Sequence, residues 1–266
     1  MKIVVCVKQV PSTDNVKFNS KTGTLMRNEV PGNINKVDIY AVSMAVQFAK
    51  EMKQRGEVVS VTAITMGPAH SSAVLRESIA YGADDGVLLC DAAFAGADTW
   101  ATSKVLAAAV RKLEDVSFIF VGKESTDGET GHIGPQIAEH LSASQITMSR
   151  RVWWNGQFMV ERVLDGICEQ LSAELPVVIS VTKQAEVSKN LSIGNIYKAY
   201  DKKIFVWMLQ DLELGKNEVG LAGSMTAVKK TFLPNSFAKG VILAGSVEEI
   251  TEELVNELYD KHILRE

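Results

Sequence analysis

The sequence has few cysteines, and none of them are paired at metal-binding or redox spacing. Three occur in 266 residues, at Cys6, Cys90 and Cys168, and no C-x-x-C motif is present. Their wide separation, with no histidine at ligand spacing, argues against a disulfide framework and against a zinc site. Each lies in an apolar run, so we expect all three to be small buried side chains.

Positive charge and long apolar runs are also scarce. The net charge is −4 at pH 7, which argues against a nucleic acid or an anionic membrane as the main partner. No run approaches the roughly 18 apolar residues of a membrane span. The N-terminal MKIVVCVKQVP predicts a short strand rather than a signal peptide. We therefore expect a cytoplasmic protein, or one from an organelle matrix.

Neither the Walker A motif nor the G-x-G-x-x-G fingerprint is present, yet one stretch has the layout of an anion site. Residues 118–121 are four consecutive apolar residues, which predicts a buried parallel strand. Gly122 ends this strand, a turn rich in Gly, Ser and Thr follows, and Pro135 suits the first turn of a helix. Unpaired N–H groups at a helix start attract phosphate. The pattern leaves two interpretations open, a phosphate site and an ordinary strand-to-helix loop.

Apolar strands alternate with periodic helices along the first part of the chain. The strands are expected at residues 2–7, 58–65, 86–90 and 118–121, and the helices at 36–55, 71–81 and 100–113. This order predicts an α/β fold with a doubly wound, mostly parallel, Rossmann-like sheet. Ligands in such sheets lie beyond the carboxyl ends of the strands, so residues 6–11, 65–68 and 122–134 should share one edge. Asn35 is an expected N-cap, and a short hairpin is expected around residues 16–18 and 25–26.

After Ser144 the pattern changes to short strands. They are expected at residues 146–148, 152–154, 158–160 and 169–171, with a hairpin at Asn155 and Gly156, which predicts a small antiparallel section. Residues 177–182 form a further buried strand that rejoins the main sheet. We place the nucleotide-binding domain at 1–185 and a C-terminal arm at 186–266. The arm ends in an amphipathic helix over 246–262, whose apolar stripe covers either this chain's own core or a partner.

With these segments assembled, the chain resembles the beta subunit of an electron-transfer flavoprotein over nearly its whole length. The matching motifs are VCVKQVP, Asn35 with Asp38, TMGPA followed by LRESIAYGADDGVLL, VGKESTDGETGHIGPQIAEHL, SIGNIYKAYDKKI and GLAGSMT. The resemblance implies an adenine-nucleotide-binding α/β domain. It also implies a heterodimer with a larger, FAD-binding alpha subunit, against which the arm would pack.

The resemblance further implies a cofactor pocket. Its residues would be Cys6, Lys8, Asn35, Asp38, Met66, Gly122, Ser125, Thr126, Asp127, Gly128, Glu129, Thr130, Gly131, His132, Ile133, Gly134, Ser224 and Thr226. Cys6 and Met66 would line the adenine or ribose, and Asp38 would accept from a hydroxyl or an adenine amine. The N–H groups from Thr126 to Gly134 would hold the phosphates. We find no acid–base pair and no nucleophile, and His132 is expected to donate to phosphate or ribose.

Two branches of the resembled family differ in what this pocket holds. In one it holds a structural AMP, and in the flavin-bifurcating branch it holds a second FAD that NADH reduces. The small, open turn and the loop at residues 220–226 favour the second branch, from which the sequence departs at Met225 and His132. One electron would then go through the alpha-subunit FAD to a high-potential acceptor and the other to ferredoxin. The alternatives are a non-catalytic AMP-bound scaffold and a universal-stress-like nucleotide module.

Partner docking and nucleotide choice complete the predictions. By position in the matching segment, Ile193 with neighbouring Leu191 would insert into an acyl-CoA dehydrogenase or a related flavin reductase, although Ile193 could instead pack on its own sheet. NADH rather than NADPH is the expected donor. No arginine lies in residues 8–11, 98–102 or 223–226 to neutralise a 2′-phosphate.

Overall fold

The computed structural model describes residues 1–12, 32–185, 191–229 and 240–264. They fall into two compact units, Met1–Lys229 and Lys230–Glu266, which are described separately. The hairpin expected around residues 16–18 and 25–26 lies outside the described residues. No helix within the described ranges is long and apolar enough to cross a membrane.

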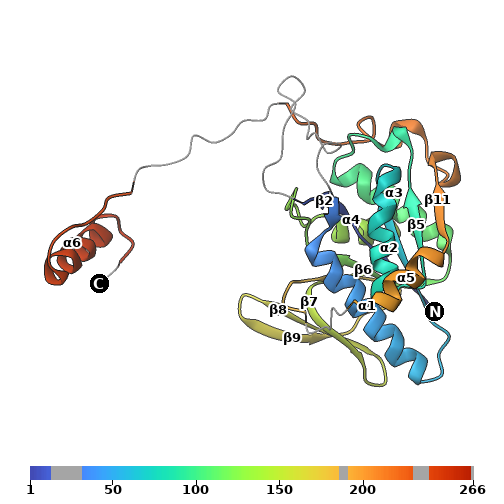
Figure 1. The fold of residues 1–266 in the computed structure, drawn as a ribbon, viewed down its shortest axis with the longest axis horizontal. Coiled ribbons are helices and arrows are strands. Elements are labelled where there is room, and N and C mark those ends of the chain that lie inside the picture. Colours follow the sequence, from blue (N-terminus) through green and yellow to red (C-terminus); the bar gives the residue numbers. More distant parts are fainter. Residues whose placement is uncertain (13–31, 186–190, 230–239, 265–266) are drawn as a thin grey trace. The chain divides into compact units, whose positions relative to one another are not determined.

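The first unit is built on a sheet with nine strands among the described residues, in the order β11-β5-β4-β1-β6-β10-β7-β8-β9 (Figure 1). The strands are β1 (Lys2–Cys6), β4 (Ser60–Met66), β5 (Asp85–Leu89), β6 (Val116–Gly122), β7 (Ser144–Trp154), β8 (Phe158–Leu164), β9 (Ile167–Leu171), β10 (Val177–Val181) and β11 (Ile204–Trp207). Neighbours from β11 to β7 pair in parallel, and β7, β8 and β9 pair antiparallel. A separate antiparallel pair joins β2 (Gln9–Pro11) to β3 (Gly32–Ile34). The predicted α/β class is confirmed.

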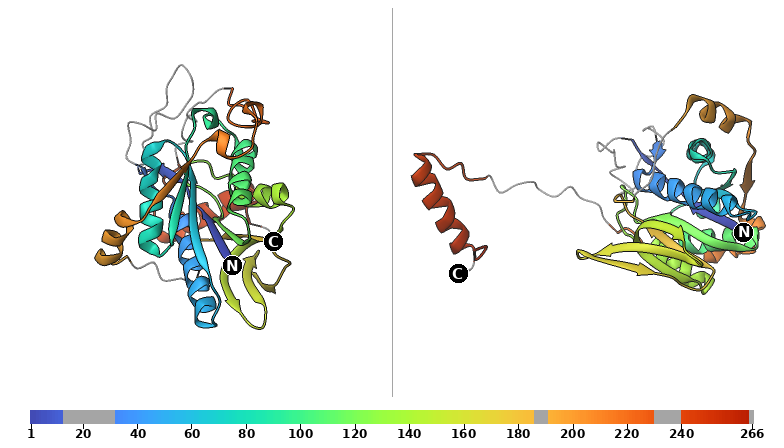
Figure 2. Two further views of the ribbon diagram at one scale, coloured as in Figure 1. Left: turned by 90° about the vertical axis from the view of Figure 1, so that its right-hand side faces the viewer. Right: turned by 90° about the horizontal axis from the view of Figure 1, so that it is seen from below.

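Helices cover both faces of the parallel strands, as two views show (Figures 1 and 2). α1 (Lys36–Gln54) and α2 (Ser72–Tyr81) contribute to one apolar cluster, and α3 (Thr99–Leu113) and α4 (Ile133–Leu141) to the other. Successive β1 residues divide between the clusters, with Val5 in the first and Cys6 in the second. A strand buried on both faces needs apolar residues at every position, which explains the continuous apolar runs. Short 3₁₀ segments lie at Ala69–Ser71, Ala92–Phe94, Leu209–Asp211 and Lys216–Glu218.

The antiparallel section differs in detail from the expectation. Residues 146–148 and 152–154 belong to one strand, β7, whose pairing shifts register after Ser149, near Met148 with its positive φ of 59°. Such an irregularity breaks the alternation of side chains, so the sequence pattern predicted two strands. Cys168 was also wrongly expected to be buried, since it is exposed on β9 at the end of the sheet. Cys6 is buried and Cys90 half-buried.

The segment expected to be a polar arm is partly regular structure of the first unit. α5 (Ile193–Asp201) packs against α2, and β11 extends the sheet beside β5. The compact unit therefore continues to Lys229, beyond the expected boundary at residue 185. A strand at a sheet edge needs only one neighbour, and β11 is too short to give a clear pattern in the sequence.

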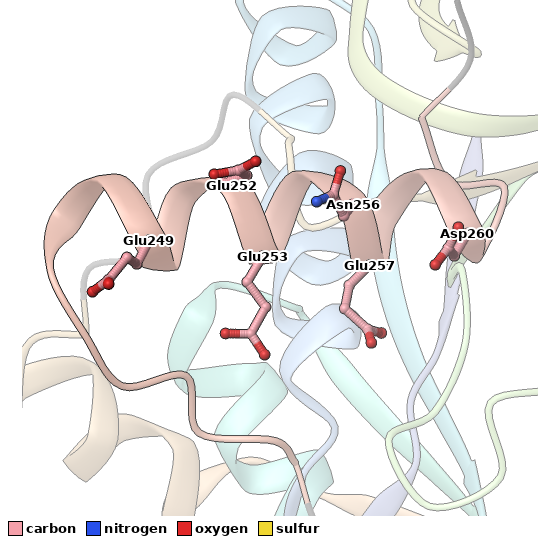
Figure 3. A pocket seen from close by; sticks show the side chains of 6 residues that line it. All are labelled: Glu249, Glu252, Glu253, Asn256, Glu257 and Asp260. Atoms are coloured by element: carbon pink, nitrogen blue, oxygen red, sulfur yellow. The ribbon is translucent and has the colours of Figure 1, made fainter.

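The second unit contains α6 (Val247–Asp260). As predicted, Ser246 is its N-cap: the hydroxyl oxygen of Ser246 accepts from the Glu249 N–H, and the Glu249 carboxylate accepts from the Ser246 N–H. None of the helix residues is buried. Figure 3 shows six side chains that follow one another along the helix, five of them acidic: Glu249, Glu252, Glu253, Asn256, Glu257 and Asp260. Taken by itself, the helix leaves its apolar stripe uncovered.

Candidate functional site

The candidate site lies beside β1, where the order of the strands in the sheet reverses. In the sheet, β4, β5 and β11 lie on one side of β1, and β6, β10 and β7 lie on the other. The ends of β1 and β6 therefore meet at the switch point, where doubly wound sheets bind ligands. The segment after β1 carries Lys8, and the turn after β6 leads into α4. Sequence reasoning placed both segments at this edge, and the structure brings them together.

The first half of the turn after β6 is folded on itself. The N–H groups of Gly128 and Glu129 both donate to the Ser125 carbonyl, at 3.3 and 2.8 Å. The Thr126 N–H donates to the side-chain oxygen of Asn35 at 3.3 Å. These three donors were expected to hold phosphates, but here they have protein acceptors. Glu129, rather than Gly128, takes a positive φ, of 48°.

The second half of the turn has a different hydrogen-bonding state. From Thr130 to Gly134, the backbone N–H groups have no acceptor among the described residues. Gly131 has a φ of 67°, which only glycine adopts without strain. A Cβ on Gly134 would lie 2.9 Å from Val121, so this glycine lets α4 approach β6 closely. Five successive donors at the positive end of a helix dipole suit an anion such as phosphate.

A polar cluster ties β1, α1 and this turn together. The Lys8 ammonium contacts the Asp127 carboxylate at 2.6 Å and the Ser125 hydroxyl at 3.1 Å. The Asp38 carboxylate accepts from the Lys8 N–H at 2.7 Å and from the Asn35 amide at 2.9 Å. A Cβ on Gly122 would lie 2.1 Å from that carboxylate, which explains why a glycine ends β6. Asn35 was expected to cap α1, but its side chain makes no capping bond.

Two buried groups in this cluster have shifted pKa values. Burial raises the pKa of Asp38 to about 7, although hydrogen bonds from Asn35, Lys8 and Gly122 favour the carboxylate. Burial, and then the neighbouring Asp38 carboxylate, raises the pKa of the Cys6 thiol to about 12. The Cys6 side chain is therefore a neutral thiol near pH 7. It packs as part of the apolar cluster under α3 and α4.

Met66 ends β4 at the same edge and is half-buried against that cluster. The next residue, Gly67, is close to Ser71, whose hydroxyl donates to the Gln9 side chain at 2.9 Å. This bond joins the segment after β4 to the segment after β1. No local pattern predicts this bond, because Gln9 and Ser71 are 62 residues apart.

The predicted residues of the GLAGSMT loop lie at the start of α3. The Asp98 carboxylate accepts from the Thr226 N–H at 2.9 Å and from its hydroxyl at 3.0 Å, and it caps α3 by accepting from the Ala101 N–H. The Ser224 hydroxyl oxygen accepts from the Asp98 N–H at 2.8 Å. Burial alone would raise the pKa of Asp98, but these hydrogen bonds outweigh it, so the pKa is lowered.

Close backbone approach fixes this loop. A Cβ on Gly220 would lie 2.0 Å from the Ala93 carbonyl oxygen, and the Leu221 N–H donates to the Ala95 carbonyl. The loop is linked to the turn after β6 through α3 and α4, since the side-chain amide of Gln136 in α4 donates to the Thr99 hydroxyl in α3 at 3.3 Å. Residues 98–102 and 223–226 are thus in contact.

Of the predicted docking residues, Ile193 is the first residue of α5, and Leu191 lies two residues before it. Ser192 caps the helix by accepting from the Asn195 N–H at 3.1 Å. Ile193 is 88% exposed and does not pack on the sheet, and Leu191 is also exposed. The C-terminal end of α5 is held by Arg76 of α2, whose guanidinium donates to the Ala199 and Lys202 carbonyls. Sequence reasoning missed Arg76, because a lone arginine on an amphipathic helix gives no sign of its distant acceptors.

The residues present fit an anionic adenine nucleotide. The backbone donors of Thr130–Gly134 and the left-handed Gly131, which has no side chain, suit a phosphate bound by the main chain. The neighbouring Cys6 and Met66 offer an apolar surface at the same edge. Among the described residues, this edge thus combines backbone N–H groups that suit a phosphate with the apolar side chains of Cys6 and Met66.

Comparisons with known proteins agree with this geometry. Residues 22–199 match the electron transfer flavoprotein domain. The chain is 40% identical to the electron transfer flavoprotein subunit beta of Thermoanaerobacterium thermosaccharolyticum, over 99% of this chain and 100% of that protein. It is 36% identical to the caffeyl-CoA reductase-Etf complex subunit CarD of Acetobacterium woodii, with 99% and 100% covered. It is 37% identical to the acryloyl-CoA reductase electron transfer subunit gamma of Anaerotignum propionicum, again with 99% and 100% covered. The chain belongs to the electron transfer flavoprotein family, as a beta subunit that acts in electron transfer.

Proposed function

We propose that this beta subunit binds FAD at the switch-point edge and accepts a hydride from NADH. The observation that carries the proposal is the row of N–H donors from Thr130 to Gly134, located where doubly wound sheets bind nucleotides. Bound flavin would supply both two-electron and one-electron redox chemistry. The chain itself would bind the diphosphate through main-chain donors and hold the adenine half beside Cys6 and Met66.

The electrons would then divide between two acceptors. One would pass through the FAD of the alpha subunit to a high-potential partner, and the other to a low-potential carrier such as ferredoxin. Relatives named for caffeyl-CoA and acryloyl-CoA reductase support an acyl-CoA dehydrogenase or related flavin enzyme as partner. In this proposal the second unit, with α6, packs on the alpha subunit, and the complex works in the cytoplasm.

The second candidate is an AMP-bound scaffold without its own flavin. The same N–H row suits a single phosphate, and the acidic side chains of Asp127 and Glu129 limit the negative charge that the turn accepts. The colour of the purified subunit and the nucleotide that it releases on heating distinguish the two candidates. Subunit purified from its source should be yellow and release FAD on heating, whereas a colourless preparation that releases AMP would favour the scaffold.

The choice of NADH follows from the loops around Asp98. The carboxylate is held by Thr226 and Ala101, and no arginine lies in residues 98–102 or 223–226. An acidic surface without arginine disfavours the 2′-phosphate of NADPH. Anaerobic reduction of the heterodimer should bleach the flavin faster with NADH. Equal or faster bleaching by NADPH would contradict this specificity.

Docking to the dehydrogenase is proposed for α5. Its exposed apolar side chains, Ile193, Ile196, Tyr197 and Tyr200, recur at the i, i+3, i+4 and i+7 positions of one stripe. The opposite side packs on α2 through Ala199, which is 1% exposed. Exposed aromatic and aliphatic side chains on a fixed helix are suited to anchor a partner.

A further inference from the structure

Asn35 occupies an unusual place for an amide side chain. It lies between β3 and α1, with 0% of its surface exposed. Its backbone N–H donates to the Lys8 carbonyl at 2.9 Å, which fixes it beside the end of β1. A buried amide must satisfy its polar atoms within the protein, because an unpaired one is costly.

The side chain of Asn35 makes two hydrogen bonds to the turn between β6 and α4, residues 123–132, which we call the phosphate turn, and one to Asp38. Its oxygen accepts from the Thr126 N–H at 3.3 Å. Its nitrogen donates to the Glu124 carbonyl at 2.9 Å and to the Asp38 carboxylate at 2.9 Å. The Asn35 side chain thus binds the main chain of the turn at Glu124 and Thr126, although Asn35 precedes Glu124 by 89 residues in the sequence.

Asp38 orients Asn35. Its carboxylate is surrounded by donors, the amide of Asn35 and the backbone N–H groups of Lys8 and Gly122. The amide nitrogen of Asn35 has two acceptors, the Asp38 carboxylate and the Glu124 carbonyl, and this orients the amide with its oxygen toward the Thr126 N–H. Asp38 is 5% exposed, so its carboxylate is directed to protein donors rather than outward.

We propose that Asn35 and Asp38 act as positioning residues, a buried pair that holds the phosphate turn in the shape that binds nucleotide. This inference rests on the proposed nucleotide site. The pair holds the first half of the turn through Glu124 and Thr126, so that the donors of the second half stay aligned.

The charge state of the pair provides a distinctive readout. The groups facing the Asp38 carboxylate are the neutral Cys6 thiol of β1 and the Lys8 ammonium, which is engaged by Asp127. The remaining neighbours are the donors of Asn35, Lys8 and Gly122. A second carboxylate placed at position 35 would repel Asp38 at high pH, and a shared proton would restore a hydrogen bond between them at low pH.

The test measures FAD binding by the full-length chain in complex with its alpha subunit, reconstituted without the beta-subunit nucleotide. FAD is the probe because its diphosphate diester does not titrate near neutral pH, unlike the phosphomonoester of AMP, whose second pKa is about 6. Asn35→Ala should weaken FAD binding at least tenfold. The melting temperature of each variant is measured in parallel, to detect unfolding. Asn33→Ala changes an exposed amide in β3, two residues before Asn35; it is the matched control and should bind like wild type.

Asn35→Asp supplies the second readout. Its deficit in FAD affinity relative to wild type should be largest at pH 8 and shrink severalfold by pH 6, and a purely structural role would leave that ratio constant. If wild type binds neither FAD nor AMP, the proposed site fails. If wild type binds and Asn35→Ala binds equally well, or the Asn35→Asp ratio does not change with pH, the positioning inference is wrong. Unfolding of both variants would make Asn35 a residue of the fold and would overturn it as well.

Discussion

The strand-end edge and the helix α5 are built in opposite ways. At the edge, polar groups from three distant segments bond to one another, and the turn after β6 carries backbone N–H groups without an acceptor among the described residues. On α5, a single continuous segment exposes apolar side chains, and the polar contacts lie at its ends, at Ser192 and Arg76. The first arrangement suits a small anion that demands fixed geometry, and the second suits a protein surface.

This difference has a consequence for mutations. Changes at the edge should spread, because each side chain there has two or three partners and their effects do not add. Changes on the exposed stripe of α5 should act locally, since those side chains have few contacts to lose. Nucleotide binding and partner docking should therefore be separable.

The largest effect is expected for Gly131→Val. A β-branched residue is strained at a φ of 67°, so the turn must change shape or the variant must bear a cost of about 3 kcal/mol. FAD affinity, measured by fluorescence titration, should fall roughly a hundredfold with far-UV helicity retained. Gly128→Ala is the control, since its Cβ would meet only Ser125 at 3.5 Å. Full FAD occupancy in Gly131→Val would contradict the role of the turn.

The second effect concerns Asp38 and pH. Its folded pKa of about 7 lies above the ordinary 3.8, so the folded state binds a proton more tightly than the unfolded state. The stability due to that proton is present below about pH 4 and is lost as the pH rises to about 7. Between pH 5 and 7 this group alone should lower the free energy of unfolding by about 2 kcal/mol.

Urea unfolding of wild type and Asp38→Asn at several pH values would isolate this contribution. The variant should lack that part of the slope, although its overall stability will be lower because an amide cannot accept from all three donors. Asp91 and Glu161, whose pKa values are lowered, contribute with the opposite sign in both proteins. Identical slopes for the two proteins would show that Asp38 does not titrate in this range.

A smaller effect is expected for Asp98→Ala. The variant loses the N-cap of α3 and both bonds from Thr226, which should lower the free energy of unfolding by about 1.5 kcal/mol. Thr226→Val removes only the hydroxyl bond and should cost less. The loop and edge are joined by the bond from Gln136 to Thr99, so NADH reduction of the flavin should also slow. An unchanged reduction rate in Asp98→Ala would separate this loop from donor binding.

The smallest change in stability is expected for Ile193→Ala. The side chain is 88% exposed, so the free energy of unfolding should stay within about 0.5 kcal/mol of wild type. Electron transfer to the dehydrogenase should slow severalfold, and NADH reduction should not change. Ile167→Ala, an exposed isoleucine on β9 at the other end of the sheet, is the matched control. If both electron transfer and flavin reduction fell together, docking and binding would not be separable.

The sequence by itself determined the layers of the fold and the position of the glycine-rich turn at the end of a central strand. Unbroken apolar runs such as 118–121 indicate strands buried on both faces, and the glycine-rich turn after them marks a helix start. Those features are local, so they can be seen in a short window of residues. The same holds for the capping box at Ser246 and Glu249, confirmed in α6.

Only the tertiary structure decided which polar groups satisfy one another. Asn35 has the sequence signature of an N-cap, but Asp38 and the turn residues Glu124 and Thr126 offered its side chain other partners. The first half of the turn likewise uses its N–H groups internally, and β11 gained its place from a single neighbour, β5. A hydrogen bond between residues 89 or 91 positions apart depends on how the sheet brings their strands together. No local pattern contains that information. A buried polar atom needs a hydrogen-bond partner, and the tertiary fold decides which partner lies within bonding distance.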